Sequence, residues 1–278
     1  MAQHLTLGYS TCPNDTSVFH ALAHGRVDLK GLTYDITLAD VEALNQKAAS
    51  GVLDISKLSF AAIGHLSDTY GLLHSGAALG RGCGPLIVAK PGVDLAGLGH
   101  FPVAVPGAWT TASLLLTLFS PRPVQMVPMT FDRIMPAIQN GAMKMGVIIH
   151  EGRFTYEAYG LTCLMDLGQW WETQTGLPIP LGGIAARRNL PADMLQKIED
   201  TLKASVCYAQ EHPGEADDYI ALHAQEMAPE VISSHIALYV NEFTRELGEE
   251  GRFAIETLFR KAREKGLLPD STAPLFAV

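Results

Sequence analysis

The feature that most constrains the fold is an alternation of short apolar strands with helical segments, which runs twice along the chain. In the first series we expect strands at residues 5–9, 32–38 and 53–55, each marked by closely spaced apolar residues. A helix is expected after each of the first two strands, and Asp40 is of a residue type that caps a helix start. This βαβαβ order predicts a parallel sheet with helices on its faces.

A second series of the same kind follows a loose connector at residues 91–99. In this series Asp132 is expected to cap a helix that ends at Gly141, and from about residue 190 onward the pattern is helical only. Further strands are expected at residues 85–90, 103–105, 125–128, 146–149 and 182–187.

Two βα series, each forming its own sheet, predict an α/β protein of two lobes. We expect the chain to cross between the lobes near residues 90 and 188, which makes a double-crossover hinge and leaves a cleft between the carboxyl edges of the sheets. The prediction is therefore a type II periplasmic-binding-protein-like fold with C-terminal helices. Its larger lobe would comprise residues 1–89 plus 189–278, and its smaller lobe residues 90–188.

Charge and hydropathy limit the partners of the chain. The formal net charge is −9 and there is no basic run, so we do not expect nucleic acid as a partner. No apolar run approaches the length of a membrane span, so we expect no membrane partner either. A small anionic substrate remains compatible with an acidic total, because a few local cations dominate the field inside a cleft. A homodimer is left open.

Cysteine spacing and the N-terminal sequence bear on the compartment. The four cysteines form no CxxC pair, so neither a zinc knuckle nor a redox pair is expected, and a reducing compartment fits them. The N-terminal residues show no basic segment followed by an apolar one, so no export signal is visible. We therefore expect a cytoplasmic protein.

Three loops each follow the carboxyl end of an expected strand and open a helix. They are Ser10–Thr16, the small polar turn Ser56–Ser59, and the turn at Thr110–Thr111. Free N–H groups and the helix dipole at such places favour carboxylates and oxyanions. Lys57 is the only lysine in these loops, which makes it a candidate anion ligand.

Each of these loops also has a purely structural interpretation. Asn14 or Asp15 would cap the helix that follows, and Lys57 would be a solvated lysine in a surface turn. The adjacent hydroxyls of Thr110 and Thr111 suit a carboxylate or a sugar-like hydroxyl, but a simple N-cap is slightly favoured. For Asn14 and Asp15 spacing alone favours capping, and for Lys57 it does not choose between the two interpretations.

His150 is the sharpest candidate for chemistry. It ends an apolar strand and is followed by Glu151, whereas a strand that only served the core would not ordinarily finish in an imidazole and a carboxylate. Histidine titrates near neutral pH, so an imidazole in the cleft would serve as a general base. The alternative is a hydrogen-bonded structural histidine. Cys12 at a helix start would be a nucleophile only if a base were assigned to it.

Several strings resemble the 1,4-dihydroxy-6-naphthoate synthase family, and the likeness covers nearly the whole chain. Thr11 departs from the proline that this family leads us to expect, but the motif that follows it is intact. The strings are Cys12–Thr16 (CPNDT), Lys57–Ser59, Gly76–Pro85, Pro106–Gly107 with Thr110–Ala112, Ile148–Glu151 with Arg153–Tyr156, Asp166–Gly168 with Trp170–Glu172, and Leu177–Gly182.

The resemblance implies a lyase of menaquinone (vitamin K2) biosynthesis by the futalosine route. Such an enzyme converts cyclic dehypoxanthinyl futalosine to 1,4-dihydroxy-6-naphthoate and releases dihydroxyacetone, with neither a metal nor an organic cofactor. It implies His150 as the general base. The expected substrate-binding residues are Asn14, Lys57, Leu58, Ser59, Thr110, Thr111 and Ala112, with Lys57, Arg81 and Arg153 as candidate cations for the substrate carboxylate.

Two other functions remain open at this point. A solute-binding protein for a small anion shares the architecture and needs no base in its cleft, although such proteins usually carry an export leader. Chorismate dehydratase, an early enzyme of the same route, is a second alternative. The CPNDT and IIHE strings weigh against it.

Overall fold

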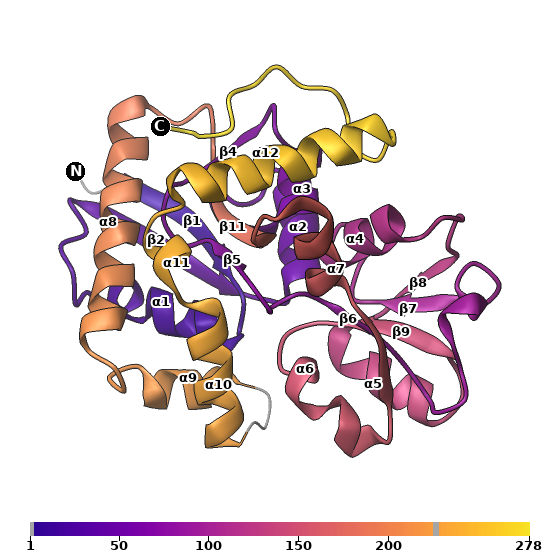
Figure 1. The fold of residues 1–278 in the computed structure, drawn as a ribbon. Helices are drawn as coiled ribbons and strands as arrows, with labels where there is room; N and C mark the ends of the chain where they lie inside the picture. The colour runs from indigo at the N-terminus through magenta and orange to yellow at the C-terminus, as the bar shows by residue number, and fades with distance from the viewer. Residues whose placement is uncertain (1–2, 225–227) are drawn as a thin grey trace.

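The computed structural model describes residues 3–224 and 228–278, which form two lobes, each built on its own sheet (Figure 1). The first sheet has the order β2-β1-β3-β11-β4, with β5 paired to β11, and the second has the order β10-β6-β9-β7-β8. The first sheet contains β1 (Gln3–Tyr9), β2 (Leu32–Leu38), β3 (Ile55–Ser59), β4 (Tyr70–Leu72), β5 (Ala78–Gly80) and β11 (Ile179–Arg187). The second contains β6 (Leu86–Ala89), β7 (Val103–Val105), β8 (Met126–Pro128), β9 (Met145–Ile148) and β10 (Thr162–Asp166).

Each sheet has a parallel part, as the βα pattern predicts. Antiparallel strands extend this part. Strand β1 runs parallel to β2 and β3, and β7 runs parallel to β8 and β9. Strand β11 is antiparallel to β3, and β6 is antiparallel to β9. The antiparallel strands β6 and β11 are the first strands the chain forms after it passes from one sheet to the other. The chain enters at the carboxyl edge, so these strands run back along the parallel ones.

The two crossings lie elsewhere than expected. The chain leaves the first sheet after β5 and enters the second at β6, so it crosses at residues 81–85 rather than near 90. It returns at residues 176–178, just before β11, rather than near 188. Both β6 and β11 are almost wholly buried apolar strands, and such strands carry no sign of which sheet they join. Residues 1 and 2 of the expected larger lobe lie outside the described residues.

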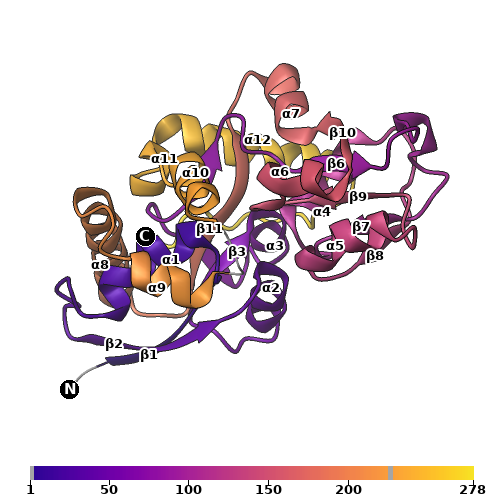
Figure 2. The ribbon, with the colours of Figure 1, turned by 90° about the horizontal axis from the view of Figure 1, so that it is seen from below.

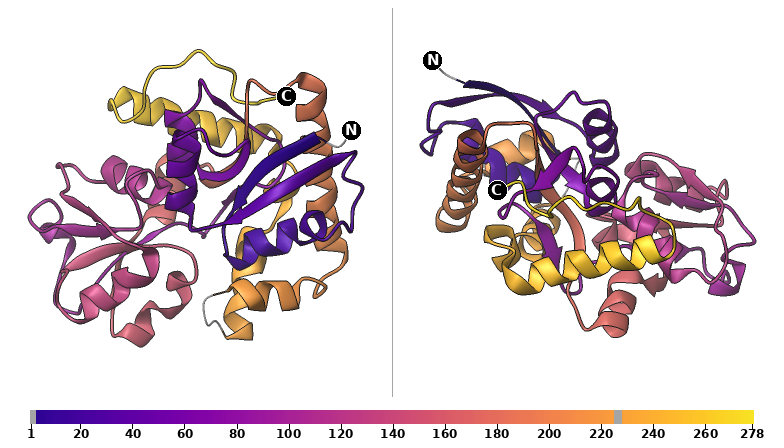
Figure 3. Two further views of the ribbon diagram at one scale, coloured as in Figure 1. Left: turned by 180° about the vertical axis from the view of Figure 1, so that it is seen from behind. Right: turned by 90° about the horizontal axis from the view of Figure 1, so that it is seen from above.

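Helices cover both faces of the first sheet, as Figures 2 and 3 show from below, behind and above. On one face, Leu7 of β1 packs in a core cluster with Phe19 and Leu202; on the other, Leu58 of β3 packs with Ile63 and Phe259. The helices are α1 (Pro13–Ala23), α2 (Val41–Ala49), α3 (Phe60–His65), α4 (Thr111–Phe119), α5 (Phe131–Gln139), α6 (Gly152–Thr155), α7 (Leu167–Thr175), α8 (Ala192–Glu211), α9 (Asp217–His223), α10 (Pro229–Tyr239), α11 (Glu242–Arg245) and α12 (Gly248–Glu264), with 3-10 turns at Leu95–Gly97 and Tyr156–Tyr159. None of the helices described combines the length and hydropathy needed to cross a membrane.

The predicted helix caps are only partly confirmed. Asp40 caps α2, because its carboxylate accepts hydrogen bonds from the backbone N–H groups of the first turn. Asp132 lies in the first turn of α5 without capping it. The helix α1 begins after Cys12, so Asn14 and Asp15 lie inside its first turn. The capping role expected for Asn14 or Asp15 was therefore wrong.

One expected turn is a strand instead. Residues 56–59, predicted as a turn because they are small and polar, form most of β3 and are buried. A polar residue in a strand normally indicates exposure, but β3 is buried on both faces. The side chains of Lys57 and Ser59 face an internal cavity rather than solvent, whereas Ser56 lies on the opposite face of the strand.

The first crossing depends on a close approach between two glycines. A Cβ placed on Gly84 would lie 2.3 Å from the backbone N and Cα of Gly168, at the start of α7. Real Cβ atoms do not approach backbone this closely, so the crossing segment and α7 can be in contact only without a side chain at position 84.

We predict that Gly84→Ala lowers the free energy of unfolding by about 2–3 kcal/mol, because the backbone of α7 must shift to admit the methyl group. Urea unfolding followed by circular dichroism measures the change. Gly152→Ala is the matched control, since a Cβ there meets Ile148 at an ordinary 3.4 Å. Its stability should change by less than about 1 kcal/mol. Equal effects of the two substitutions would contradict the prediction.

Candidate active site

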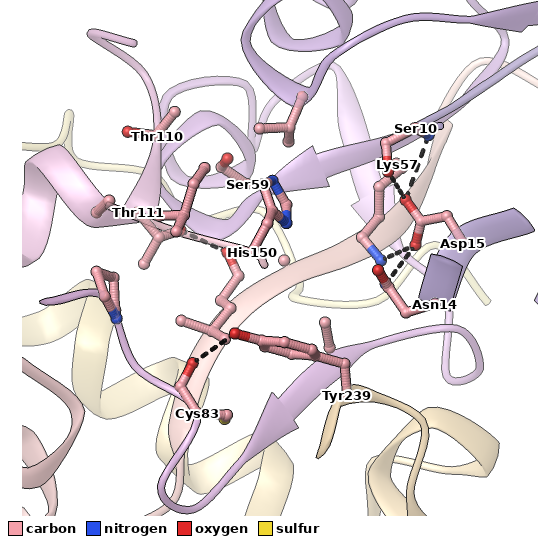
Figure 4. Close-up of a pocket in the computed structure, with 17 residues that line it drawn as sticks. Ser10, Asn14, Asp15, Lys57, Ser59, Cys83, Thr110, Thr111, His150 and Tyr239 are labelled. Carbon is pink, nitrogen blue, oxygen red and sulfur yellow. Dashed lines mark hydrogen bonds and ion pairs between the residues drawn. The ribbon is translucent and has the colours of Figure 1, made fainter. Parts of the chain in front are cut away.

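A cavity of about 630 Å³ lies between the two lobes and is lined by residues from both of them (Figure 4). The polar groups gather in two places: around Asp15 in the larger lobe, and at the start of α4 in the smaller lobe. The lining residues are Ser10, Asn14, Asp15, Val41, Lys57, Ser59, Ala78, Cys83, Pro85, Thr110, Thr111, Ala112, Ile149, His150, Leu181, Gly182 and Tyr239.

The wall formed by the larger lobe is organised around the carboxylate of Asp15. This carboxylate accepts hydrogen bonds from the Ser10 backbone N–H and hydroxyl, from Asn14 Nδ2 at 2.9 Å and from Lys57 Nζ at 2.6 Å. The Lys57 and Asp15 side chains are only 7% and 4% exposed. The carboxylate is thus saturated with donors and is not available as a base, whereas Lys57 keeps two N–H donors for a ligand.

The wall formed by the smaller lobe presents the start of α4. Both threonine hydroxyls donate to backbone carbonyls: Thr110 to Gly107 at 2.9 Å, and Thr111 to Leu181 at 2.6 Å. The sequence suggested that these hydroxyls would donate to a carboxylate, but in the structure both are already used. What remains for an anion are the backbone N–H groups of Thr111 and Ala112, which the helix itself leaves without acceptors.

His150 follows β9 and lies at the cavity in a left-handed backbone conformation, with φ of 55°. Its Nδ1 lies 3.5 Å from the Cys12 Sγ of the opposite lobe, and Phe131 contacts its ring edge-on with the centroids 5.3 Å apart. Its Nε2 makes no hydrogen bond within the described part of the chain. Burial lowers the pKa of His150, and the nearby Glu151 carboxylate opposes that shift only in part. The ring is therefore neutral at neutral pH.

The cysteines near the cavity are protonated thiols. Burial, reinforced by the negative charge of Glu151, raises the pKa of Cys12 far above its usual range. Burial likewise raises the pKa of Cys83 to about 12. A thiol is a poor nucleophile compared with a thiolate, so this environment does not favour the alternative in which Cys12 attacks the substrate.

Three residues expected at the site do not line the cavity. Arg81 is on the surface and pairs with Glu250. Arg153 holds the carbonyl of Gly84 and the carboxylate of Asp166. Leu58 is fully buried in the core, because alternation along β3 turns it away from the face that carries Lys57 and Ser59.

Two site residues were missed from the sequence, and both come from α10. Tyr239 lines the cavity and donates its hydroxyl hydrogen to the carbonyl of Cys83. His235, one helical turn earlier, lies behind the cavity wall and contacts Asn14. Their spacing of four places both on one face of a helix, but nothing in the sequence shows which face meets the cleft.

No group of three or more His, Cys, Asp or Glu side chains is placed to share a metal ion in the parts of the chain described here. The groups that the described residues place at the cavity are an imidazole, a buried ion pair, backbone N–H donors and a tyrosine hydroxyl.

Comparison with known proteins points to one family. Residues 5–264 match the family described as "Menaquinone biosynthesis". A relative from Thermus thermophilus, named 1,4-dihydroxy-6-naphthoate synthase, is 48% identical over 272 residues that cover 98% of each chain. A relative of the same name from Streptomyces coelicolor is 47% identical over 274 residues, or 96% of each chain.

Solved structures agree with the expected fold. A protein from Archaeoglobus fulgidus is 35% identical and superposes with a TM-score of 0.90 over 95% of this chain and 98% of that one. The alkanesulfonate-binding protein of Xanthomonas axonopodis reaches 0.73 at 14% identity, covering 97% of this chain and 96% of that one. At that identity the likeness shows the fold alone, which confirms the periplasmic-binding-protein-like architecture.

We predict that Lys57→Met destabilises the protein by about 3–5 kcal/mol, because it leaves the buried Asp15 carboxylate without its counter-charge. Lys30→Met is the matched control: Lys30 and Asp200 also form a close pair, at 2.5 Å, but their side chains are 41% and 38% exposed. Its cost should stay below about 1 kcal/mol. Urea unfolding measures the loss of stability in both variants. Equal losses would show that burial does not set the strength of the ion pair.

Proposed function

Because this chain belongs to the menaquinone-biosynthesis family, we propose that it is a lyase that converts cyclic dehypoxanthinyl futalosine to 1,4-dihydroxy-6-naphthoate and releases dihydroxyacetone. The names of the two relatives, at 47–48% identity over nearly the whole chain, support this activity. The observation that carries the mechanism is the placement of His150, a neutral imidazole at a cavity between two lobes, with one ring nitrogen unoccupied. The cytoplasmic location stays a prediction.

In this proposal His150 is the general base. Loss of the three-carbon fragment with formation of an aromatic ring requires removal of a proton. If Nδ1–H donates to the sulfur of Cys12, Nε2 is bare and accepts that proton. Cys12 belongs to the opposite lobe, so the contact requires the two lobes to be together. Closure of the lobes would also exclude water and align the groups.

The two polar walls would hold the substrate. We assign the substrate carboxylate to Lys57 and Asn14, because Lys57 is the one of the three candidate cations that lines the cavity. The N–H groups of Thr111 and Ala112 would stabilise negative charge that develops on a substrate oxygen, and Ser59 would add a hydroxyl. This scheme needs no metal and no organic cofactor, since the only chemical task that it gives to a protein group is the transfer of a proton.

The direct test is to dialyse the purified protein against EDTA, incubate it with cyclic dehypoxanthinyl futalosine and follow the products by mass spectrometry. We expect 1,4-dihydroxy-6-naphthoate and dihydroxyacetone in equal amounts. We expect His150→Gln to fold normally but to lower kcat by about 10²–10⁴. Exposed His212, changed to Gln in parallel, should leave kcat unchanged.

Other results would point to the alternatives. Binding of the substrate without product would favour a solute-binding protein, and consumption of chorismate would favour the dehydratase. Near-normal turnover by His150→Gln would place the base elsewhere.

The pH dependence follows from the lowered pKa of His150. A protonated ring cannot accept a proton, so kcat/KM should be lost as the pH falls through that pKa and should be constant above it. Because burial lowers the pKa from its usual 6.5, the acid limb should lie below that value. Rates measured from about pH 5 to about pH 9 test this. An acid limb centred above neutral pH would contradict a buried, neutral base.

A further inference from the structure

A buried histidine of the C-terminal helices is in direct contact with the cavity wall. His235 lies on α10, is 0% exposed, and places its Nε2 2.9 Å from Oδ1 of Asn14. Its ring contacts that of Tyr239 in a tilted arrangement, with the centroids 4.6 Å apart, and lies 6.2 Å from the ring of His150. His235 does not itself line the cavity, so it can act on a ligand only through a neighbour.

The direction of each hydrogen bond in this chain of contacts follows from the carboxylate at its end. An ionised carboxylate only accepts hydrogen bonds, so Asn14 must turn its Nδ2 toward Asp15, at 2.9 Å. The amide oxygen of Asn14 then faces His235, and an oxygen can only accept. His235 must therefore donate, which requires its proton to be on Nε2.

The charge state of His235 agrees with this assignment. Burial, together with the nearby His150 and the positive charge of Lys57, lowers the pKa of His235 to about 3. It therefore carries one ring proton at neutral pH, on Nε2, and its Nδ1 makes no hydrogen bond within the described residues. A neutral ring of fixed tautomer is a constant donor across the whole physiological range.

The hydrogen bond from His235 sets the orientation of the Asn14 amide at the cavity wall. One hydrogen of Asn14 Nδ2 is bonded to Asp15, which leaves the second for a ligand, next to the free N–H groups of Lys57. If the Asn14 oxygen lost its donor it would be a buried acceptor without a partner, and the side chain would rotate to satisfy it. The amide nitrogen would then be withdrawn from the wall.

We propose that His235 is a positioning residue that holds Asn14 with its amide nitrogen toward the cavity, so that this wall presents N–H donors to a carboxylate of the ligand. The inference rests on the proposed function for the identity of the substrate, but the anion preference of the wall is testable without it. The same proposal gives α10, one of the helices in the C-terminal part of the chain, a part in substrate selection.

The experiment uses the isosteric pair His235→Gln and His235→Met in the full chain. Glutamine places an N–H donor where the imidazole has Nε2, whereas methionine fills similar space without a donor. Binding of 2-naphthoate and of neutral 2-naphthamide is measured by titration calorimetry. We expect His235→Met to weaken naphthoate binding about tenfold and to leave naphthamide binding nearly unchanged. His235→Gln should retain naphthoate binding to within about threefold, and His212→Met at the surface should change neither.

A double-mutant cycle shows whether His235 acts through Asn14. If it does, Asn14→Ala combined with His235→Met should bind naphthoate no more weakly than Asn14→Ala alone, whereas independent effects would multiply. Imidazole ¹⁵N spectra provide a second readout, which does not depend on ligand binding. The wild-type signal that disappears in His235→Gln belongs to His235. It should be that of a neutral ring protonated on Nε2, and it should not titrate between about pH 5 and about pH 9.

Equal naphthoate affinities for the Gln and Met variants, multiplicative effects in the cycle, a proton on Nδ1, or no naphthoate binding by the wild type would each overturn the inference. These outcomes are separable from failure of the proposed function. A protein that shows the expected coupling but never releases dihydroxyacetone retains the anion-selecting wall and loses only the assigned reaction. A protein that turns over its substrate without the coupling retains the reaction and loses the role of His235.

Discussion

The buried ion pair between Lys57 and Asp15 is the interaction on which the rest of the site depends. Taking both charges out of water is costly, and the pair is tolerated only because donors fill the remaining positions of the carboxylate. It ties β3 to the first turn of α1. Asn14 and Ser10 then take their orientation from the same carboxylate. A cluster of this kind contributes less to stability than to fixing one arrangement of the wall.

The smaller lobe completes the site across the hinge. The Thr111 hydroxyl donates to the carbonyl of Leu181 and accepts from the N–H of Ala61, and both partners belong to the larger lobe. The Glu42 carboxylate accepts from the backbone N–H of Trp109 at 3.1 Å. These bonds hold α4 against the first sheet, and they use the hydroxyl of Thr111, one of the two threonines expected to bind the substrate. The helix start is thereby fixed, and its backbone N–H groups remain for the ligand.

The sequence predicted the two sheets, the βα rhythm and the strand that delivers His150, because apolar periodicity is a local property. It could not predict which sheet receives β6 or β11, since a strand buried on both faces looks the same in either sheet. Lys57 was assigned to a turn because a lysine in a short polar segment normally indicates exposure. Its burial is compensated by an ion pair with Asp15, which lies 42 positions earlier in the chain. The contact of His235 with Asn14 spans 221 positions, and only packing decides it.

The fold is shared with proteins that only bind small molecules, such as the alkanesulfonate-binding protein, so the architecture by itself does not explain catalysis. A binding protein needs a wall that complements its ligand in one charge state, and the Asp15 cluster with its N–H donors is such a wall.

Catalysis also needs a group that changes its protonation during the reaction. In the proposed mechanism His150 is that group: burial keeps its ring neutral, and its backbone is held in an unfavourable left-handed conformation at the edge of the cavity. Strain of this kind persists only where the surroundings enforce it, and here the position faces the cleft at the point where the two lobes meet. An enzyme can thus arise on a binding scaffold by placing one titratable side chain where lobe closure brings it to the bound anion.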